Sequence, residues 1–122
     1  MRVLVHGGAG SEPDDPERRA DVLERAAETG VDAETPLAAV EESVRVLESD
    51  PGFNAGVGSA VQSDGRIRTD AGVMTDDGSV GAVCSTPDLE HAVSAARAVL
   101  EESNVASVSA FSVIGPSDSN VL

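Results

Sequence analysis

The sequence contains no tryptophan, tyrosine or lysine, and it has one cysteine and two phenylalanines. Because Cys84 is alone, no internal disulfide can form, and its simplest role is that of a small buried residue. With Phe53 and Phe111 as the only aromatic residues, the core must be assembled from Val, Leu, Ile and Ala. A chain of 122 residues built in this way is one small domain or part of a larger one, and we expect it to need a partner for stability.

All eight basic residues are arginine, against 22 acidic residues, and the formal net charge is −14. Such a surface repels nucleic acid and anionic membranes, so neither is an expected partner. The hydrophobic content of 40% argues against a disordered acidic segment, and the acidic bias is typical of a salt-rich cytoplasm, where ions screen self-repulsion. The apolar run Val3-Leu4-Val5 is too short for a signal peptide, and no stretch could span a membrane. We therefore expect a cytoplasmic protein, and the acidic charge indicates that its source is a halophile.

Periodicity and turn residues predict an α/β (α+β) fold in which helices cover a mostly antiparallel sheet. Helices are expected at residues 16–30, from residue 36 to the break at residues 50–52, and at residues 89–102 behind a cap at residues 86–88. Strands are expected at residues 2–5, 58–62, 66–74 and 79–85, and a weaker pattern suggests one more at residues 110–114. On the second helix, Glu41, Glu42 and Arg45 are expected to face water.

The rest of the chain is organised around residues 47–75, which combine a helix end, a Pro-Gly turn, a Gly-x-Gly step and a hairpin turn. Core packing does not require the run Phe53-Asn54-Ala55-Gly56-Val57-Gly58. Gly56 and Gly58 remove side chains where the backbone turns with positive φ or approaches another group closely. Asn54 adds an amide donor and acceptor beside them, so the run is typical of the wall of a site.

A second glycine run, His6-Gly7-Gly8-Ala9-Gly10, follows the first predicted strand. It reads as a strand-to-loop turn, with or without a role in binding. A phosphate-binding loop is a weaker interpretation, because the run lacks the Lys-Ser/Thr ending of a P-loop and the spacing of a dinucleotide fingerprint. His6 itself is expected to be packed and hydrogen-bonded rather than catalytic.

These two runs belong to five ordered pieces that resemble the N-terminal half of the plant-type asparaginase/isoaspartyl peptidase family of N-terminal-nucleophile hydrolases. The pieces are Val3 to Gly10, Leu47-Glu48 through Pro51 to Gly58, Asp70-Ala71 with Met74, Gly81-Ala82-Val83, and a helix that closes on Glu101-Glu102-Ser103. The resemblance covers residues 1–103, whereas residues 104–122 are Ser-rich and divergent. It implies a four-layer αββα fold, of which this chain supplies about half.

The resemblance implies a mechanism whose central group is missing here. Family members cut themselves before a Thr, whose freed α-amino group then acts as the base for its own hydroxyl. That Thr and most substrate-binding groups belong to the second half of the family sequence. We therefore expect this chain to be inactive alone. Its expected partner is a complementary Thr-bearing β-subunit region, in a heterotetramer of two first and two second subunits, or else further copies of the chain in a homo-oligomer. The complete enzyme would hydrolyse the side-chain amide of asparagine or a β-aspartyl peptide bond.

Two alternatives stay open: a non-catalytic remnant or binding subunit, and a minimal hydrolase that uses Ser79. Gly78-Ser79-Val80-Gly81-Ala82-Val83 resembles the sequence around the family nucleophile, with Ser in place of Thr. The upstream pieces Asp70-Ala71 and Met74 favour the interpretation of Ser79 as a sheet residue of the first subunit. Whether the chain is truncated, frameshifted or naturally short is also open.

The resemblance assigns roles to residues of both glycine runs. His6, Gly7, Gly8 and Gly10 would line the pocket or position the nucleophile, and Asn54 beside Gly56 would hold the nucleophile by hydrogen bonds. Alternatively, Asn54 only caps its own loop. No cofactor is expected except a structural sodium ion held by main-chain carbonyls. Its ligands would come from Leu47, Glu48, Asp50 and Phe53.

Overall fold

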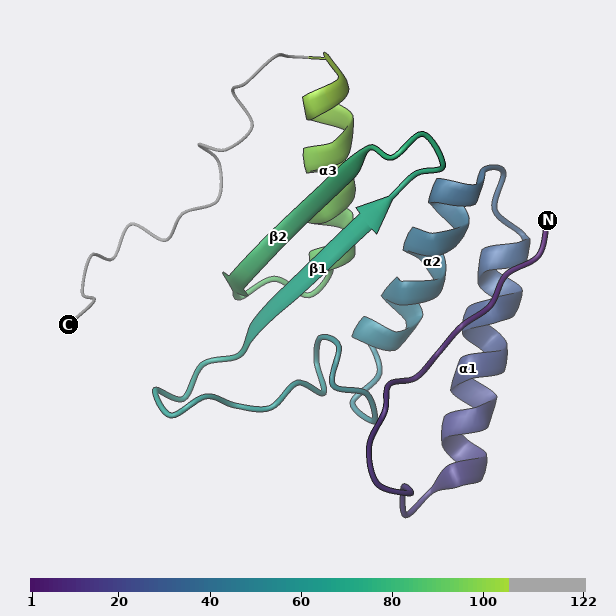
Figure 1. The fold of residues 1–122 in the computed structure, drawn as a ribbon. Coiled ribbons are helices and arrows are strands. Elements are labelled where there is room, and N and C mark those ends of the chain that lie inside the picture. The colour runs from purple at the N-terminus through teal and green to yellow at the C-terminus, as the bar shows by residue number, and fades with distance from the viewer. Residues whose placement is uncertain (106–122) are drawn as a thin grey trace.

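The computed structural model describes residues 1–105 and contains three helices and two strands. The elements follow in the order α1 (Pro16–Val31), α2 (Pro36–Glu48), β1 (Arg68–Met74), β2 (Val80–Pro87) and α3 (Ala92–Val105). The helices lie on one side of an antiparallel two-stranded sheet, which confirms the predicted mixed fold (Figure 1). Most of the segment 104–122, including the weak strand pattern at residues 110–114, lies outside the described residues.

The helix starts follow their capping residues. Pro16 occupies the first turn of α1, and the Thr35 side chain accepts a hydrogen bond of 3.2 Å from the Ala38 amide at the start of α2. The third helix begins at Ala92, later than predicted, because β2 continues to Pro87 and Asp88 has a left-handed φ of 56° that no helix accommodates. No described helix is long and apolar enough to cross a bilayer.

The two strands pair from Met74 opposite Val80 to Arg68 opposite Pro87. The register shifts at Asp70, which faces both Cys84 and Ser85 in a β-bulge. Ser85 has a φ of 51°, and its amide donates a hydrogen bond of 2.6 Å to Asp70 Oδ1. Cys84 is exposed on the outer face, so the expectation that it is buried was wrong: strand alternation directs its neighbour Val83 into the core instead.

Two predicted strands do not form within the described part of the chain. Residues 58–62 form loop structure, because Ser59 and Ala60 donate their amides to Gly56 and Asn54, and only the turn around Gly65 survives from the predicted hairpin. Residues 2–5 lack strand pairing, since no described strand lies beside them. They are also not buried as predicted: Leu4 is 96% exposed, while Val3 and Val5 are half-buried.

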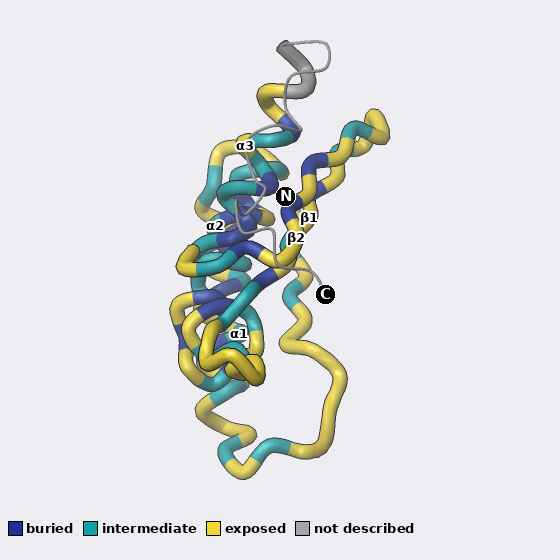
Figure 2. Tube along the Cα trace, turned by 90° about the vertical axis from the view of Figure 1, so that its left-hand side faces the viewer, coloured by how far each residue is buried: buried dark blue, intermediate teal, exposed yellow. Residues whose placement is uncertain are grey.

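Two clusters form the core. One joins the inner face of the sheet to α3, and the other joins α1 and the end of α2 to Phe53 (Figure 2). Gly81 lets α3 approach the sheet, since a Cβ there would lie 2.1 Å from the Ala96 carbonyl oxygen. No described element covers the outer face of the sheet, where Met74 is 72% and Val80 57% exposed. The described chain therefore has one buried sheet face and one apolar face open to solvent.

Glu41 departs from its predicted exposure. It is buried between α2 and α3, where it accepts hydrogen bonds from Ser94 Oγ at 2.5 Å and Arg97 Nη1 at 2.7 Å. The helical spacing that placed Glu41 on a solvated face did not anticipate the arrival of α3 on that face.

Candidate functional site

The two glycine runs meet in one cavity of about 920 Å³. Its walls come from the N-terminal loop, the start of α1 and the loop that follows α2. Five of the six predicted pocket residues line it: His6, Gly7, Gly8, Gly10 and Asn54. Two of the predicted sodium ligands, Leu47 and Phe53, line it as well. Gly56 does not line the cavity, but it shapes the loop that does. Residues more than forty positions apart are thus brought to one place.

Direct packing of Gly7 against Phe53 joins the two runs. A Cβ on Gly7 would lie 2.9 Å from Phe53 Cε1, so a larger residue there would push the loops apart. The next residue, Gly8, has a φ of 101°, and its amide donates a hydrogen bond of 3.0 Å to His6 Nδ1. His6 is therefore hydrogen-bonded as expected, but it is exposed rather than packed.

Gly56 and Gly58 are needed for close approach, not for a left-handed backbone. A Cβ on Gly56 would lie 2.4 Å from the Glu48 carbonyl oxygen. A Cβ on Gly58 would lie 2.3 Å from the Phe53 oxygen and 2.5 Å from the Pro51 oxygen. The loop thus curls around its own carbonyls, closed by the hydrogen bond of 2.8 Å from the Val57 amide to the Glu48 oxygen.

The predicted sodium ligands are backbone carbonyls of this loop, those of Leu47, Glu48, Asp50 and Phe53. Backbone oxygens gathered in one loop at a helix C-terminus are the ligand type that a hard cation prefers. The oxygens of Leu47, Glu48 and Asp50 each also accept an amide hydrogen bond inside the loop, and a carbonyl oxygen has a second lone pair available. The donor set therefore fits such an ion chemically.

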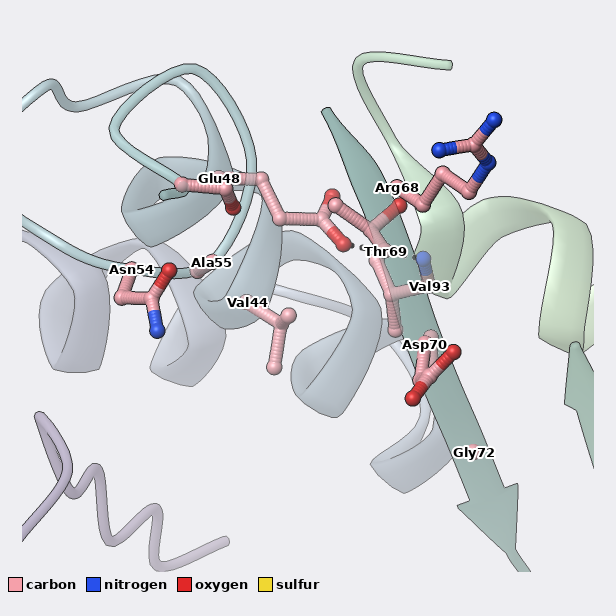
Figure 3. A pocket seen from close by; sticks show the side chains of 11 residues that line it. Val44, Glu48, Asn54, Ala55, Arg68, Thr69, Asp70, Gly72 and Val93 are labelled. Atoms are coloured by element: carbon pink, nitrogen blue, oxygen red, sulfur yellow. Dashed lines mark hydrogen bonds between the residues drawn. The ribbon is translucent and has the colours of Figure 1, made fainter. Parts of the chain in front are cut away.

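The Asn54 side chain makes a hydrogen bond within its own loop and also borders two cavities. Its Oδ1 accepts a hydrogen bond of 3.1 Å from the Ala60 amide, as the loop-capping alternative predicts. Within residues 1–105, its Nδ2 has no hydrogen-bond partner, so this amide is available as a donor. Asn54 lines both the large cavity and a second one of about 440 Å³ between α2 and β1 (Figure 3).

The Glu48 side chain borders this second cavity and is only 2% exposed. Its carboxylate accepts a hydrogen bond of 2.9 Å from the Val93 amide in the first turn of α3 (Figure 3). The other carboxylate oxygen lies 3.0 Å from His91 Nδ1. Burial raises the pKa of Glu48 above its ordinary value, although the Val93 amide and His91 act in the opposite direction. Sequence reasoning assigned a role to the backbone of this residue and missed the side chain.

A second group that sequence reasoning missed comes from the first turn of α1. Arg18 Nη2 lies 3.0 Å from both carboxylate oxygens of Asp50, and Arg19 lines the large cavity. Two cations near a helix N-terminus are unfavourable for the helix dipole. Their position in the sequence could therefore have indicated that Arg18 and Arg19 bind specific partners.

Ser79 lies apart from these groups. It follows the turn between β1 and β2, at the far end of the strands from the Asn54 loop (Figure 1). Its amide donates to Asp77 Oδ1 at 2.9 Å, and its carbonyl oxygen accepts from the Thr75 amide. Ser79 lines neither the large cavity nor the second one.

Within residues 1–105, the large cavity offers groups that can bind a ligand but no activated nucleophile. Its lining includes Gly-rich backbone, the Asn54 amide and Arg19, and its single hydroxyl side chain is that of Ser11. Among the described residues Ser11 has no hydrogen bond to His6, so it lacks the adjacent base that a hydroxyl nucleophile needs. Among the described residues, the arrangement is that of a site wall.

Comparison with known proteins gives a consistent result. The family model described as Asparaginase matches residues 1–112. The plant-type L-asparaginase of Pyrococcus abyssi is 37% identical over 111 residues, which is 85% of this chain and 36% of that protein. The isoaspartyl peptidase/L-asparaginase of Macaca fascicularis is 40% identical over 108 residues, 82% of this chain and 35% of that protein. The human isoaspartyl peptidase/L-asparaginase is 37% identical over 108 residues. The chain spans about a third of the length of these relatives, and it belongs to the asparaginase family.

Proposed function

We propose that this chain is the N-terminal part of an asparaginase/isoaspartyl peptidase-type amidohydrolase and that it is inert without a complementary region. The observation that carries the proposal is a cavity where both family glycine runs meet and where no described hydroxyl has a neighbouring base. The relatives it resembles are about three times as long, which leaves room for the missing groups.

The complementary region would supply a Thr with a free α-amino group. An α-amine with a pKa of about 8 can take the proton of the adjacent hydroxyl near neutral pH. The hydroxyl then attacks the amide carbon of asparagine or of a β-aspartyl peptide, and ammonia or an amine leaves with the proton that the α-amine returns. Water then hydrolyses the resulting Thr ester, which releases aspartate and restores the hydroxyl. In this arrangement Asn54 Nδ2 would donate a hydrogen bond that orients the nucleophile, and the loop at residues 6–10 would close the wall behind it.

The complementary region also needs a place to dock. The outer face of the sheet presents Met74 and Val80 to solvent, and residues 2–5 have backbone groups that no described strand pairs. Both features suit a partner that brings a second sheet, as in an αββα sandwich.

We take the acidic surface as an adaptation to a salt-rich cytoplasm. We also assign the carbonyl loop at residues 47–53 to a structural sodium ion, which would stabilise the loop without taking part in the reaction.

The first test measures aspartate release from asparagine and from a β-aspartyl dipeptide by the 122-residue chain in high salt. Intact mass is recorded on the same sample. We expect no release and an uncut chain. Release accompanied by a cut before Ser79 would instead establish a minimal self-processing hydrolase.

The second arm co-expresses the chain with the C-terminal two thirds of the Pyrococcus abyssi relative, the part that this chain does not match. We expect cleavage of that partner, a stable complex and amide hydrolysis, and we expect Asn54→Ala to lower kcat while the complex persists. A stable complex without cleavage or activity would favour the non-catalytic binding subunit.

A further inference from the structure

We propose that Arg18 and Arg19 are positioning residues that hold the loop of residues 50–58 and thereby orient Asn54. Nothing in the resemblance assigns them this task, and the proposal rests on the proposed function only for the role of Asn54. Both arginines lie in the first turn of α1, more than thirty residues from the loop in sequence. The three-dimensional contacts carry the inference.

Arg18 holds the start of the loop through Asp50. Its Nη2 donates to both oxygens of the Asp50 carboxylate at 3.0 Å, and Asp50 Oδ1 in turn accepts from the Gly52 amide at 2.8 Å. Asp50 is buried, so its charge needs these donors. There is also no room for a side chain at Gly52, where a Cβ would lie 2.6 Å from Arg18 Nη1. The guanidinium, the carboxylate and the turn form one packed unit.

Arg19 holds the next two residues of the loop. Its Nε donates to Asp15 Oδ1 at 2.8 Å, which fixes the guanidinium against the N-terminus of α1. From there Nη1 donates to the Gly52 carbonyl oxygen, and the guanidinium carbon lies 5.8 Å from the centre of the Phe53 ring. Phe53 directly precedes Asn54 and packs against Gly7, so a shift of its ring would move both walls of the large cavity.

The two arginines matter because the loop has little regular structure of its own. Residues 50–58 contain no helix or strand, and the far end of the loop is held by the backbone bond from Val57 to Glu48 and by the amides of Ser59 and Ala60. Cations at the N-terminus of α1 are unfavourable for the helix itself. Arg18 and Arg19 therefore destabilise the first turn of α1 slightly, and their contacts with Asp50 and Gly52 stabilise the loop.

The test is amide hydrogen exchange on the full chain, with Arg18→Gln and Arg19→Gln as the variants and Arg25→Gln as the matched control. Arg25 is exposed on the same helix, and its guanidinium acts on Asp50 only through space, without a hydrogen bond or ion pair within residues 1–105, so it controls for the loss of charge alone. All three variants remove one positive charge. The reporting amides are those of Val57, Ser59 and Ala60, none of which contacts either arginine.

We expect exchange of these three amides to accelerate about tenfold or more in Arg18→Gln and Arg19→Gln, with exchange in β1, β2 and α3 unchanged. Arg25→Gln should leave the whole pattern unchanged. Arg18→Lys, which keeps the charge but loses the fork, should give an intermediate acceleration.

Equal acceleration throughout the chain would overturn the proposal, because the arginines would then contribute only to global stability. Unchanged loop exchange in Arg18→Gln and Arg19→Gln, or unprotected loop amides in the unmodified chain, would overturn it too. None of these readouts depends on amide hydrolysis. If the loop amides depend on Arg18 and Arg19 as expected but the assembled complex never hydrolyses amides, the proposed function is refuted. The role of the two arginines is then still supported.

Discussion

Glu48 is a buried carboxylate whose ionisation costs stability. Burial raises the folded-state pKa of Glu48 above the unfolded value. The stability that protonated Glu48 contributes is therefore fully present below the unfolded pKa and is lost as the pH rises through the folded pKa. Each unit of that shift corresponds to about 1.4 kcal/mol. Glu48→Gln keeps an oxygen for the Val93 amide and removes the charge. We therefore expect the variant to be more stable than the parent at pH 7–8, measured by urea unfolding.

The advantage of Glu48→Gln should shrink as the pH is lowered to about 3, where Glu48 is largely protonated in both folded and unfolded chains. Glu102→Gln, at an exposed position on α3, is the matched control and should show no such pH dependence. A Glu48→Gln variant that is less stable than the parent at pH 8 would mean that the contacts with Val93 and His91 outweigh burial.

Ser85 adopts a backbone conformation that suits glycine. A left-handed φ costs a residue with a Cβ about 1–2 kcal/mol, whereas glycine pays about 0.5–1 kcal/mol in unfolded-state entropy. With its φ of 51° in the β-bulge, Ser85→Gly should therefore raise the free energy of unfolding by about 0.5 kcal/mol. Ser63→Gly, at an exposed position without a left-handed φ, should lower it slightly. If thermal unfolding ranks the two variants in the opposite order, backbone strain at the bulge is not significant.

Helices α2 and α3 are joined by a polar contact between Glu41, Ser94 and Arg97. Burial alone would raise the pKa of Glu41, but the hydrogen bonds from Ser94 and Arg97 outweigh it and lower the pKa. A lowered pKa contributes stability above the unfolded value, and this is lost as the pH falls through the folded one. Glu41→Gln should therefore destabilise the chain by about 1–3 kcal/mol at neutral pH, and by less at pH 3.

Arg97 supplies the control for this contact, since its Nε also donates to the exposed Glu101 within α3 at 2.7 Å. Glu101→Gln should cost no more than about 0.5 kcal/mol, because water screens the exposed pair. Equal losses in Glu41→Gln and Glu101→Gln, measured by urea unfolding at neutral pH, would show that burial between the helices adds nothing to the pair.

The uncovered sheet face affects how the chain behaves without its complement. Met74 and Val80 are paired neighbours and both are exposed, so the isolated chain should self-associate through this face, more strongly in high salt. Met74→Glu with Val80→Glu should shift sedimentation toward the monomer. Val31→Glu, which adds a charge at an exposed apolar position on α1, should not. A parent chain that is monomeric at high concentration would contradict this expectation.

Sequence reasoning located the three helices, the β1–β2 hairpin and both glycine runs, because caps, Pro and Gly positions and apolar spacing act over a few residues. It misplaced residues 2–5 and 58–62, whose extended patterns need a neighbouring strand to become part of a sheet. It also misassigned Glu41 and Cys84, since burial of a side chain depends on which element packs against it. Asn54 was predicted to be a site residue, whereas no role was predicted for the side chain of Glu48 or for Arg18 and Arg19.

The helices and the need for glycine at residues 56 and 58 thus followed from chemistry that is local in the chain, and the family followed from the resemblance of its short motifs. Folding in three dimensions decided that Gly7 packs against Phe53, that Glu48 caps α3 and that two arginines of α1 hold the Asn54 loop. Each of these contacts joins residues more than thirty positions apart. Periodicity records which face of an element is apolar, but it does not record which distant group will meet that face, and that physical difference separates the two sets of conclusions.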